Sequence, residues 1–194
     1  MLTAVPFFST AQRYGLFAIV LHWTVAGAAL ALFALGWWMT GLDYYHPWYH
    51  RAPALHQSFG VLFTALVVLR LTLRLTAPPV EIILLPRWQR LASRLVHQAL
   101  DGLLILVVLS GYLLTTAKGQ GIDVFGWFTV PAIHIVLDRQ EDLAGFWHET
   151  TAWTMIVTAG LHAAAALDHH FRRRDDVLRA MLGIRSVTGE HRTP

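Results

Sequence analysis

The sequence predicts an all-α membrane protein in which four transmembrane helices form an up-and-down bundle. The 194 residues are 55% hydrophobic and only 14% charged, and the mean hydropathy is +0.47, which is too apolar for a soluble domain of this length. Four long apolar runs separate the charged segments. Because one span needs about 20 apolar residues, the chain has room for one bundle and little else. We therefore predict a single membrane domain over residues 1–194.

The first two spans are expected over about 14–38 and about 54–75. The first run carries no charged residue, and it is too long for the apolar part of a signal peptide, so it should remain as the first helix. The second run should end before the proline pair at 78–79, because proline disfavours helical geometry in the preceding residue and cannot continue the hydrogen-bond ladder. The short apolar segment 80–86 is expected to lie at the membrane interface.

The last two spans are expected over about 89–116 and about 143–171. Between them, residues 118–142 form a stretch that is too long and too mixed in composition for a turn. Connections of this length are often functional. Tryptophans near the span ends are typical of membrane interfaces; they are Trp37, Trp38, Trp48, Trp88, Trp127 and Trp147.

The distribution of basic residues predicts the orientation. One side of the predicted bundle carries most of the arginines, namely Arg13, Arg70, Arg74, Arg87, Arg90, Arg94 and those from Arg172 onward. The other side carries Arg51, Lys118 and Arg139. The positive-inside rule then places both termini in the cytoplasm. It also accounts for the sequence pI near 9.7, so we expect no nucleic-acid partner.

Five histidines lie inside the apolar spans, where an ionisable side chain is costly and needs a partner. His148 and His162 are fourteen residues apart, which returns to nearly the same helix face about 21 Å further along the axis. One helix therefore presents two imidazoles at two depths. His56, near the outer start of the second span, is level with His148. His22, in the first span, is level with His162, and so is His97 in the third.

Facing pairs of imidazoles inside an apolar bundle are typical of bis-histidine haem ligation. The chain has no cysteine, which excludes iron–sulfur clusters, thiolate-ligated haem and covalently attached haem. Zinc or a di-iron centre would need carboxylates or more histidines at one level. We predict two haems b, one held by His56 and His148 and one by His22 and His162, with His97 as an alternative to His22. The other reading is a haem-free bundle in which these histidines form buried hydrogen bonds.

Several segments together resemble the prokaryotic cytochrome b561 family of di-haem membrane cytochromes. They are Ile19-Val20-Leu21-His22-Trp23, Leu55-His56-Gln57-Ser58-Phe59-Gly60 with Val68-Leu69-Arg70-Leu71, Trp147-His148-Glu149-Thr150, and the run from Gly160 to Phe171. The likeness covers nearly the whole transmembrane region and is strongest to bacterial superoxide oxidases. It implies a bacterial inner membrane protein with the same four histidines as axial ligands.

The resemblance also implies an electron acceptor, ubiquinone, and a residue that contacts it, His169. A solvated histidine at the membrane interface is the alternative reading of His169. His97 matches a histidine common in the third span of the family. Arg70 and Arg74 share one helix face, so they could pair with haem propionates or with lipid phosphates.

Two functions agree with these residues. The first is a superoxide:ubiquinone oxidoreductase, in which electrons leave superoxide without bond formation, so that no catalytic residue is certain and Arg51, Lys118 and Arg139 only attract the anion. Acidic residues on the same side oppose that attraction. The second is a haem-b anchor and electron-relay subunit of a periplasmic dehydrogenase or hydrogenase complex. Both would contact membrane lipid and quinone.

Overall fold

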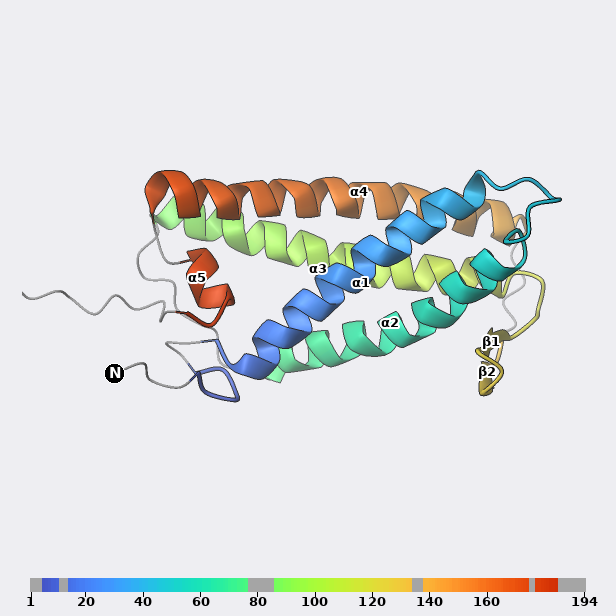
Figure 1. The fold of residues 1–194 in the computed structure, drawn as a ribbon, viewed down its shortest axis with the longest axis horizontal. Coiled ribbons are helices and arrows are strands. Elements are labelled where there is room, and N and C mark those ends of the chain that lie inside the picture. Colours follow the sequence, from blue (N-terminus) through green and yellow to red (C-terminus); the bar gives the residue numbers. More distant parts are fainter. Residues whose placement is uncertain (1–4, 11–13, 77–85, 134–137, 175–176, 185–194) are drawn as a thin grey trace, which may run out of the picture. The chain divides into compact units, whose positions relative to one another are not determined.

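The computed structural model describes residues 5–10, 14–76, 86–133, 138–174 and 177–184, and these are mostly helical (Figure 1). Four helices are long and apolar enough to cross a membrane, which confirms the predicted four-transmembrane-helix fold. They are α1 (Leu16–Thr40), α2 (Arg51–Thr76), α3 (Arg87–Thr115) and α4 (Gln140–Asp168), and α4 continues into a π-helical turn, η1 (His169–Arg173).

The helix boundaries lie within three residues of the predicted ones. α2 begins at Arg51, earlier than expected, because Pro53 lies in the first turn, where a missing N–H leaves no hydrogen bond unmade. α4 begins at Gln140 and carries Glu141 and Asp142 in its first turn, where carboxylates interact favourably with the helix dipole. Most of the expected interfacial segment, residues 80–85, lies outside the described residues.

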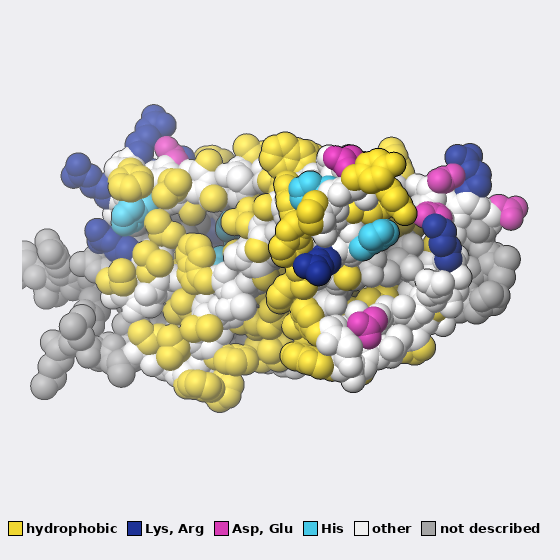
Figure 2. Space-filling model, turned by 45° about the vertical axis from the view of Figure 1, so that its right-hand side comes forward, with side chains coloured by type: hydrophobic (Ala, Val, Ile, Leu, Met, Phe, Trp, Pro, Cys, Tyr) yellow, Lys and Arg dark blue, Asp and Glu magenta, His cyan; other side chains and the backbone are white. Residues whose placement is uncertain are grey.

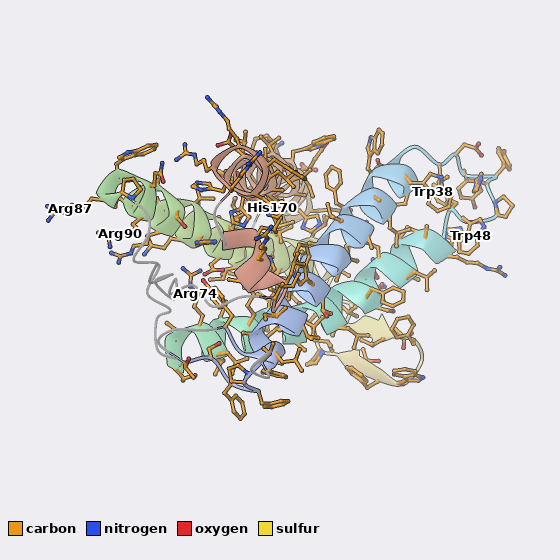
Figure 3. All side chains as sticks on the ribbon, turned by 60° about the vertical axis from the view of Figure 1, so that its left-hand side comes forward. Trp38, Trp48, Arg74, Arg87, Arg90 and His170 are labelled. Atoms are coloured by element: carbon orange, nitrogen blue, oxygen red, sulfur yellow. The ribbon has the colours of Figure 1, made fainter. Side chains whose placement is uncertain are left out.

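The spanning helices expose apolar side chains over most of their length. Only 11–17% of the residues in the most apolar window of each helix are buried, and hydrophobic side chains cover much of the visible helix surface in Figure 2. In water this surface would be unstable, so it is the lipid-facing surface of a membrane protein. Figure 3 shows Trp38 and Trp48 where α1 ends and α2 begins, with ring centroids 6.2 Å apart.

The chain forms two compact units, and all four spanning helices contribute to both. The described residues of unit 1 fall within Met1–Thr24, Leu69–Leu100 and Val157–Pro194, and those of unit 2 within Val25–Val68 and Asp101–Ile156. Unit 1 therefore holds His22, His97 and His162, whereas unit 2 holds His56 and His148.

In unit 2, the stretch expected as an irregular loop contains a β-hairpin. Strand β1 (Ile122–Val124) pairs antiparallel with β2 (Phe128–Val130). Phe125 and Gly126 have φ values of 53° and 72°, as in a tight hairpin turn with two left-handed residues. The hairpin packs on α2, where the Ser58 Oγ donates to the Asp123 carbonyl at 3.2 Å and accepts the Phe125 N–H at 3.3 Å. Figure 1 shows the hairpin beside the first turns of α2.

In unit 1, residues 6–9 fold back onto the start of α1. The Pro6 carbonyl accepts the Leu16 N–H at 2.8 Å, and the Ser9 Oγ accepts the Gly15 N–H at 3.0 Å, which satisfies backbone donors that the start of a helix leaves unpaired. A Cβ at Gly15 would collide with the Phe8 backbone. Near the other terminus, the short helix α5 (Val177–Met181) packs against η1.

Candidate functional site

His56 on α2 and His148 on α4 face each other in unit 2. Their ring centroids are 6.1 Å apart and the ring planes are perpendicular, at 90°. Two imidazoles that bind one iron from opposite sides, each through a bond of about 2 Å, have centroids about 6 Å apart. The structure therefore brings together the two histidines that were matched by depth, at a separation that fits an iron between them.

The hydrogen bonds of His148 determine which ring nitrogen is available to a metal. Its Nδ1 lies 3.0 Å from the Val107 carbonyl and 3.3 Å from the Ser110 Oγ. A carbonyl only accepts, so the hydrogen is on Nδ1, and Nε2 keeps the lone pair that a metal requires. Such a bond on the far nitrogen is the usual device for orienting a ligating histidine. His148 is thus held in the tautomer that ligates haem iron.

Each histidine of this pair lies against a glycine of a neighbouring helix. A Cβ added to Gly36 of α1 would be 3.1 Å from His56 Cε1, and one added to Gly111 of α3 would be 2.9 Å from His148 Cε1. The contact at Gly111 is closer than real Cβ atoms allow and the one at Gly36 is tighter than most, so the two glycines leave room for the two rings. Neither glycine can be recognised as part of the site from the sequence alone, because glycines within a span also serve ordinary helix packing.

We predict that Gly111→Val will displace the His148 ring and leave one haem b per chain instead of two. The reason is steric, since the new side chain occupies the place of the imidazole. Haem per chain, measured by the pyridine haemochrome spectrum of the purified protein, tests this. Gly102→Ala, on the same helix, is the control, because a Cβ there meets no heavy atom within 4 Å in the described structure. Two haems in Gly111→Val would contradict the prediction.

In unit 1, three histidines from three helices share one location. The rings of His97 and His162 have centroids 4.9 Å apart, at an interplanar angle of 67°. His22 interacts electrostatically with both of them. The Nδ1 of His97 lies 3.4 Å from the Ser93 Oγ one turn earlier on α3. The location thus contains the predicted pair, His22 and His162, together with the predicted alternative, His97.

Two arginines of α2 reach this histidine cluster. Arg70 Nη1 lies 3.4 Å from His22 Nδ1, and Arg74 Nη1 donates to the His97 carbonyl at 3.2 Å. The two propionates of a haem would neutralise the positive charge of these arginines, because guanidinium groups bind carboxylates strongly.

Just outside the span, burial raises the pKa of the Tyr14 phenol, and the nearby Arg74 opposes this rise. The phenol is therefore protonated at neutral pH.

The predicted quinone contact, His169, is the first residue of η1. It follows His162 by seven residues, about 10 Å along a helix. η1 ends at Arg173, and the next residue, Arg174, has a φ of 54° and donates its N–H to the His169 carbonyl. Asp168 accepts a charged contact from Arg173 at 3.3 Å. Figure 3 shows other arginines of unit 1, namely Arg74, Arg87 and Arg90.

The basic residues expected to attract an anion from the outer side are partly neutralised. Lys118 Nζ lies 3.0 Å from Glu141, and Arg139 Nε lies 3.2 Å from Asp142. Both pairs are exposed, and exposed ion pairs contribute little to stability. They nevertheless reduce the positive potential that Lys118 and Arg139 could offer to an approaching anion.

A model of the family described as "Prokaryotic cytochrome b561" matches residues 13–183, a range that contains all four spanning helices. The chain belongs to the prokaryotic cytochrome b561 family. It is 44% identical over 182 residues to "Cytochrome b561 homolog 2" of Escherichia coli (strain K12), which covers 92% of this chain and 96% of that protein. It is 25% identical over 177 residues to "Probable superoxide oxidase CybB" of Yersinia pestis, and this alignment covers 88% of this chain and 96% of that protein.

Membership of the b561 family makes this chain a multi-pass bacterial membrane protein of electron transfer, as the resemblance implied. The family implies haem b, and the residues fit that group. His148 presents Nε2, two glycines leave space for the rings of His56 and His148, and two arginines reach the other histidine cluster.

Proposed function

We propose that this protein is a di-haem b cytochrome that transfers electrons from superoxide, on the outer side, to ubiquinone in the bacterial inner membrane. The observation that carries the haem assignment is the 6.1 Å separation of the His56 and His148 rings, with His148 held in the ligating tautomer. The superoxide assignment is supported by the similarity to the Yersinia pestis protein named "Probable superoxide oxidase CybB". The basic residues support an orientation with both termini in the cytoplasm.

The four residues that would hold the two haems are His56 with His148 and His22 with His162. Haem b bound there supplies a reversible one-electron couple at each site. Arg70 and Arg74 would hold the propionates of the haem between His22 and His162, called the inner haem below. A guanidinium only donates, so its present contact with His22 Nδ1 favours a hydrogen on Nε2. If His22 binds iron through Nε2, the Arg70 guanidinium has to move away from Nδ1. A haem propionate would draw it away, because a guanidinium binds a carboxylate more strongly than it binds an imidazole nitrogen.

The proposed reaction needs no bond between protein and substrate. Two superoxide anions each lose one electron and become dioxygen, while ubiquinone gains both electrons and two protons and becomes ubiquinol. On the outer side the chain only has to attract the anion, a role that Arg51, Lys118 and Arg139 share. On the inner side His169 would donate a hydrogen bond to a quinone carbonyl and deliver a proton from the cytoplasm.

One experiment tests the haem and the donor together. The purified protein is examined by a dithionite-reduced minus air-oxidised spectrum with haem quantified per chain, and then given a pulse of superoxide with ubiquinone present. We expect two haems b that are reduced during the pulse and reoxidised by quinone. Two haems that do not respond to superoxide would contradict the proposed donor, and a protein without haem would contradict the proposal as a whole.

A second function, electron relay within a larger complex, is favoured by two observations on the outer side. Glu141 and Asp142 neutralise part of the positive charge that an anion would meet. The hairpin exposes aromatic side chains, with Trp127 76% and Phe128 50% exposed, and such a surface suits either the membrane interface or a protein partner. A relay subunit would copurify with a periplasmic partner and fail the superoxide pulse, whereas a superoxide oxidase would act alone.

A further inference from the structure

His170 is a half-buried histidine of η1 with a ring nitrogen that the functions above do not use. Its Nδ1 is shielded from solvent and makes no hydrogen bond within the part of the chain that the structure describes. A buried polar atom without a partner costs free energy, so native structures rarely keep one unless a ligand or water completes it. The neighbouring Phe171 ring lies 4.9 Å from the His170 ring, edge to face, and provides no hydrogen-bond acceptor in its plane.

The local backbone is unusual at the same place. η1 is a π-helical turn, a rare conformation that occurs often at functional sites because it changes the direction of side chains relative to an α-helix. The turn directly follows α4, in which His162 lies eight residues before His170. It thus presents His170 differently from the way a continued α-helix would.

The short helix α5 packs against η1, the turn that carries His170, and Figure 3 shows His170 beside it. The indole Nε1 of Trp23 donates to the Met181 carbonyl at 3.0 Å, which ties α5 to α1. Ala180 of α5 is only 3% exposed. The ring of Trp23 also lies 5.3 Å from that of His22, so this bond ties α5 to α1 next to the histidine cluster of unit 1.

Apolar side chains close to His170 along the helix are exposed. Phe171 is 71% exposed, and Leu167, about one turn before His170, is 48% exposed. Exposed apolar side chains at the end of a span face lipid. A ligand that reaches His170 past these residues would therefore come from the bilayer. It would combine an apolar body with an acceptor for a ring N–H, which is the chemistry of a quinone head group.

We propose that His170 contacts the quinone at the inner end of the protein, with Nδ1 donating to a quinone carbonyl and α5 forming one wall of the site. The inference rests on the proposed function, because that function places the quinone near η1. It adds to it a second histidine, next to His169, and gives α5 a role. His170 would be a binding residue that orients the head group toward His169.

The test is direct binding of decylubiquinone to the oxidised, haem-loaded protein in detergent, measured by isothermal titration calorimetry. We expect His170→Phe, which keeps the ring shape without the nitrogen, to weaken binding by about tenfold, the usual cost of a lost hydrogen bond to a bound ligand. His170→Gln, which restores a donor, should recover part of the affinity. His50→Phe, an exposed histidine of unit 2, is the matched control and should bind like the wild type.

Two further readouts separate the possible failures. Haem per chain and the reduced spectrum should be the same in wild type and all variants. If His170→Phe loses haem or stability, His170→Gln and His170→Ala take its place. Normal haem content and wild-type affinity for decylubiquinone in both of these variants would overturn the inference. Wild-type affinity in a well-folded His170→Phe would also overturn it. Failure of the wild type to bind decylubiquinone would instead contradict the proposed acceptor.

Discussion

Replacement of His148 by alanine is expected to lower the haem content from two haems b per chain to one. Of the unit 2 pair, His148 is the histidine whose Nδ1 is hydrogen-bonded, to the Val107 carbonyl at 3.0 Å. This bond orients the ring, so His148 Nε2 is the atom of that site best placed to bind iron. Without it, His56 would be the one histidine left to hold that iron, and we expect this site to lose its haem during purification. The pyridine haemochrome spectrum per chain measures the loss.

Ser110→Ala is the matched control for His148→Ala. It removes the hydroxyl 3.3 Å from His148 Nδ1 but leaves the Val107 carbonyl in place, so both haems should remain and only the reduction potential of one should change. Imidazole added during expression of His148→Ala should restore part of the second haem by filling the vacated space. Retention of both haems in His148→Ala, without imidazole, would show that His148 is not a ligand.

The long-range arrangement of the histidines was largely predictable from the sequence. Apolar runs of more than 20 residues determine where spans lie, because the bilayer permits few other structures. Once His56 and His148 are placed in their spans, the rise of 1.5 Å per residue determines their depth. Two residues at one depth in neighbouring helices can meet, and the structure shows that these two do.

The details around the histidines were not predictable in the same way. The hairpin at 122–130 depends on Ser58, which is 65 residues away from Asp123, and its strands have three residues each, too few for a clear alternating pattern. Gly36 and Gly111 gain their meaning only when the helices that carry them pack on His56 and His148. α5 has five residues and depends on a bond from Trp23, which no local pattern indicates.

His22→Ala is expected to remove the inner haem, whereas His97→Ala should keep two haems per chain. The ring separation of His97 and His162 is 4.9 Å, shorter than the about 6 Å that an iron with two axial imidazoles requires. The pair in unit 2, at 6.1 Å, meets that requirement. This short separation favours His97 as a residue that packs beside the inner haem, which leaves His22 as the proposed ligand together with His162.

Haem per chain and electron paramagnetic resonance of the oxidised protein distinguish the two histidines. His97→Ala should retain two low-spin signals, with a change in the potential of one, because both axial imidazoles remain. His22→Ala should lose one low-spin signal together with one haem. The reverse result would make His97 the ligand. If each single variant kept both haems and only the double variant lost one, then His22 and His97 could substitute for each other, and the assignment of a single partner to His162 would be wrong.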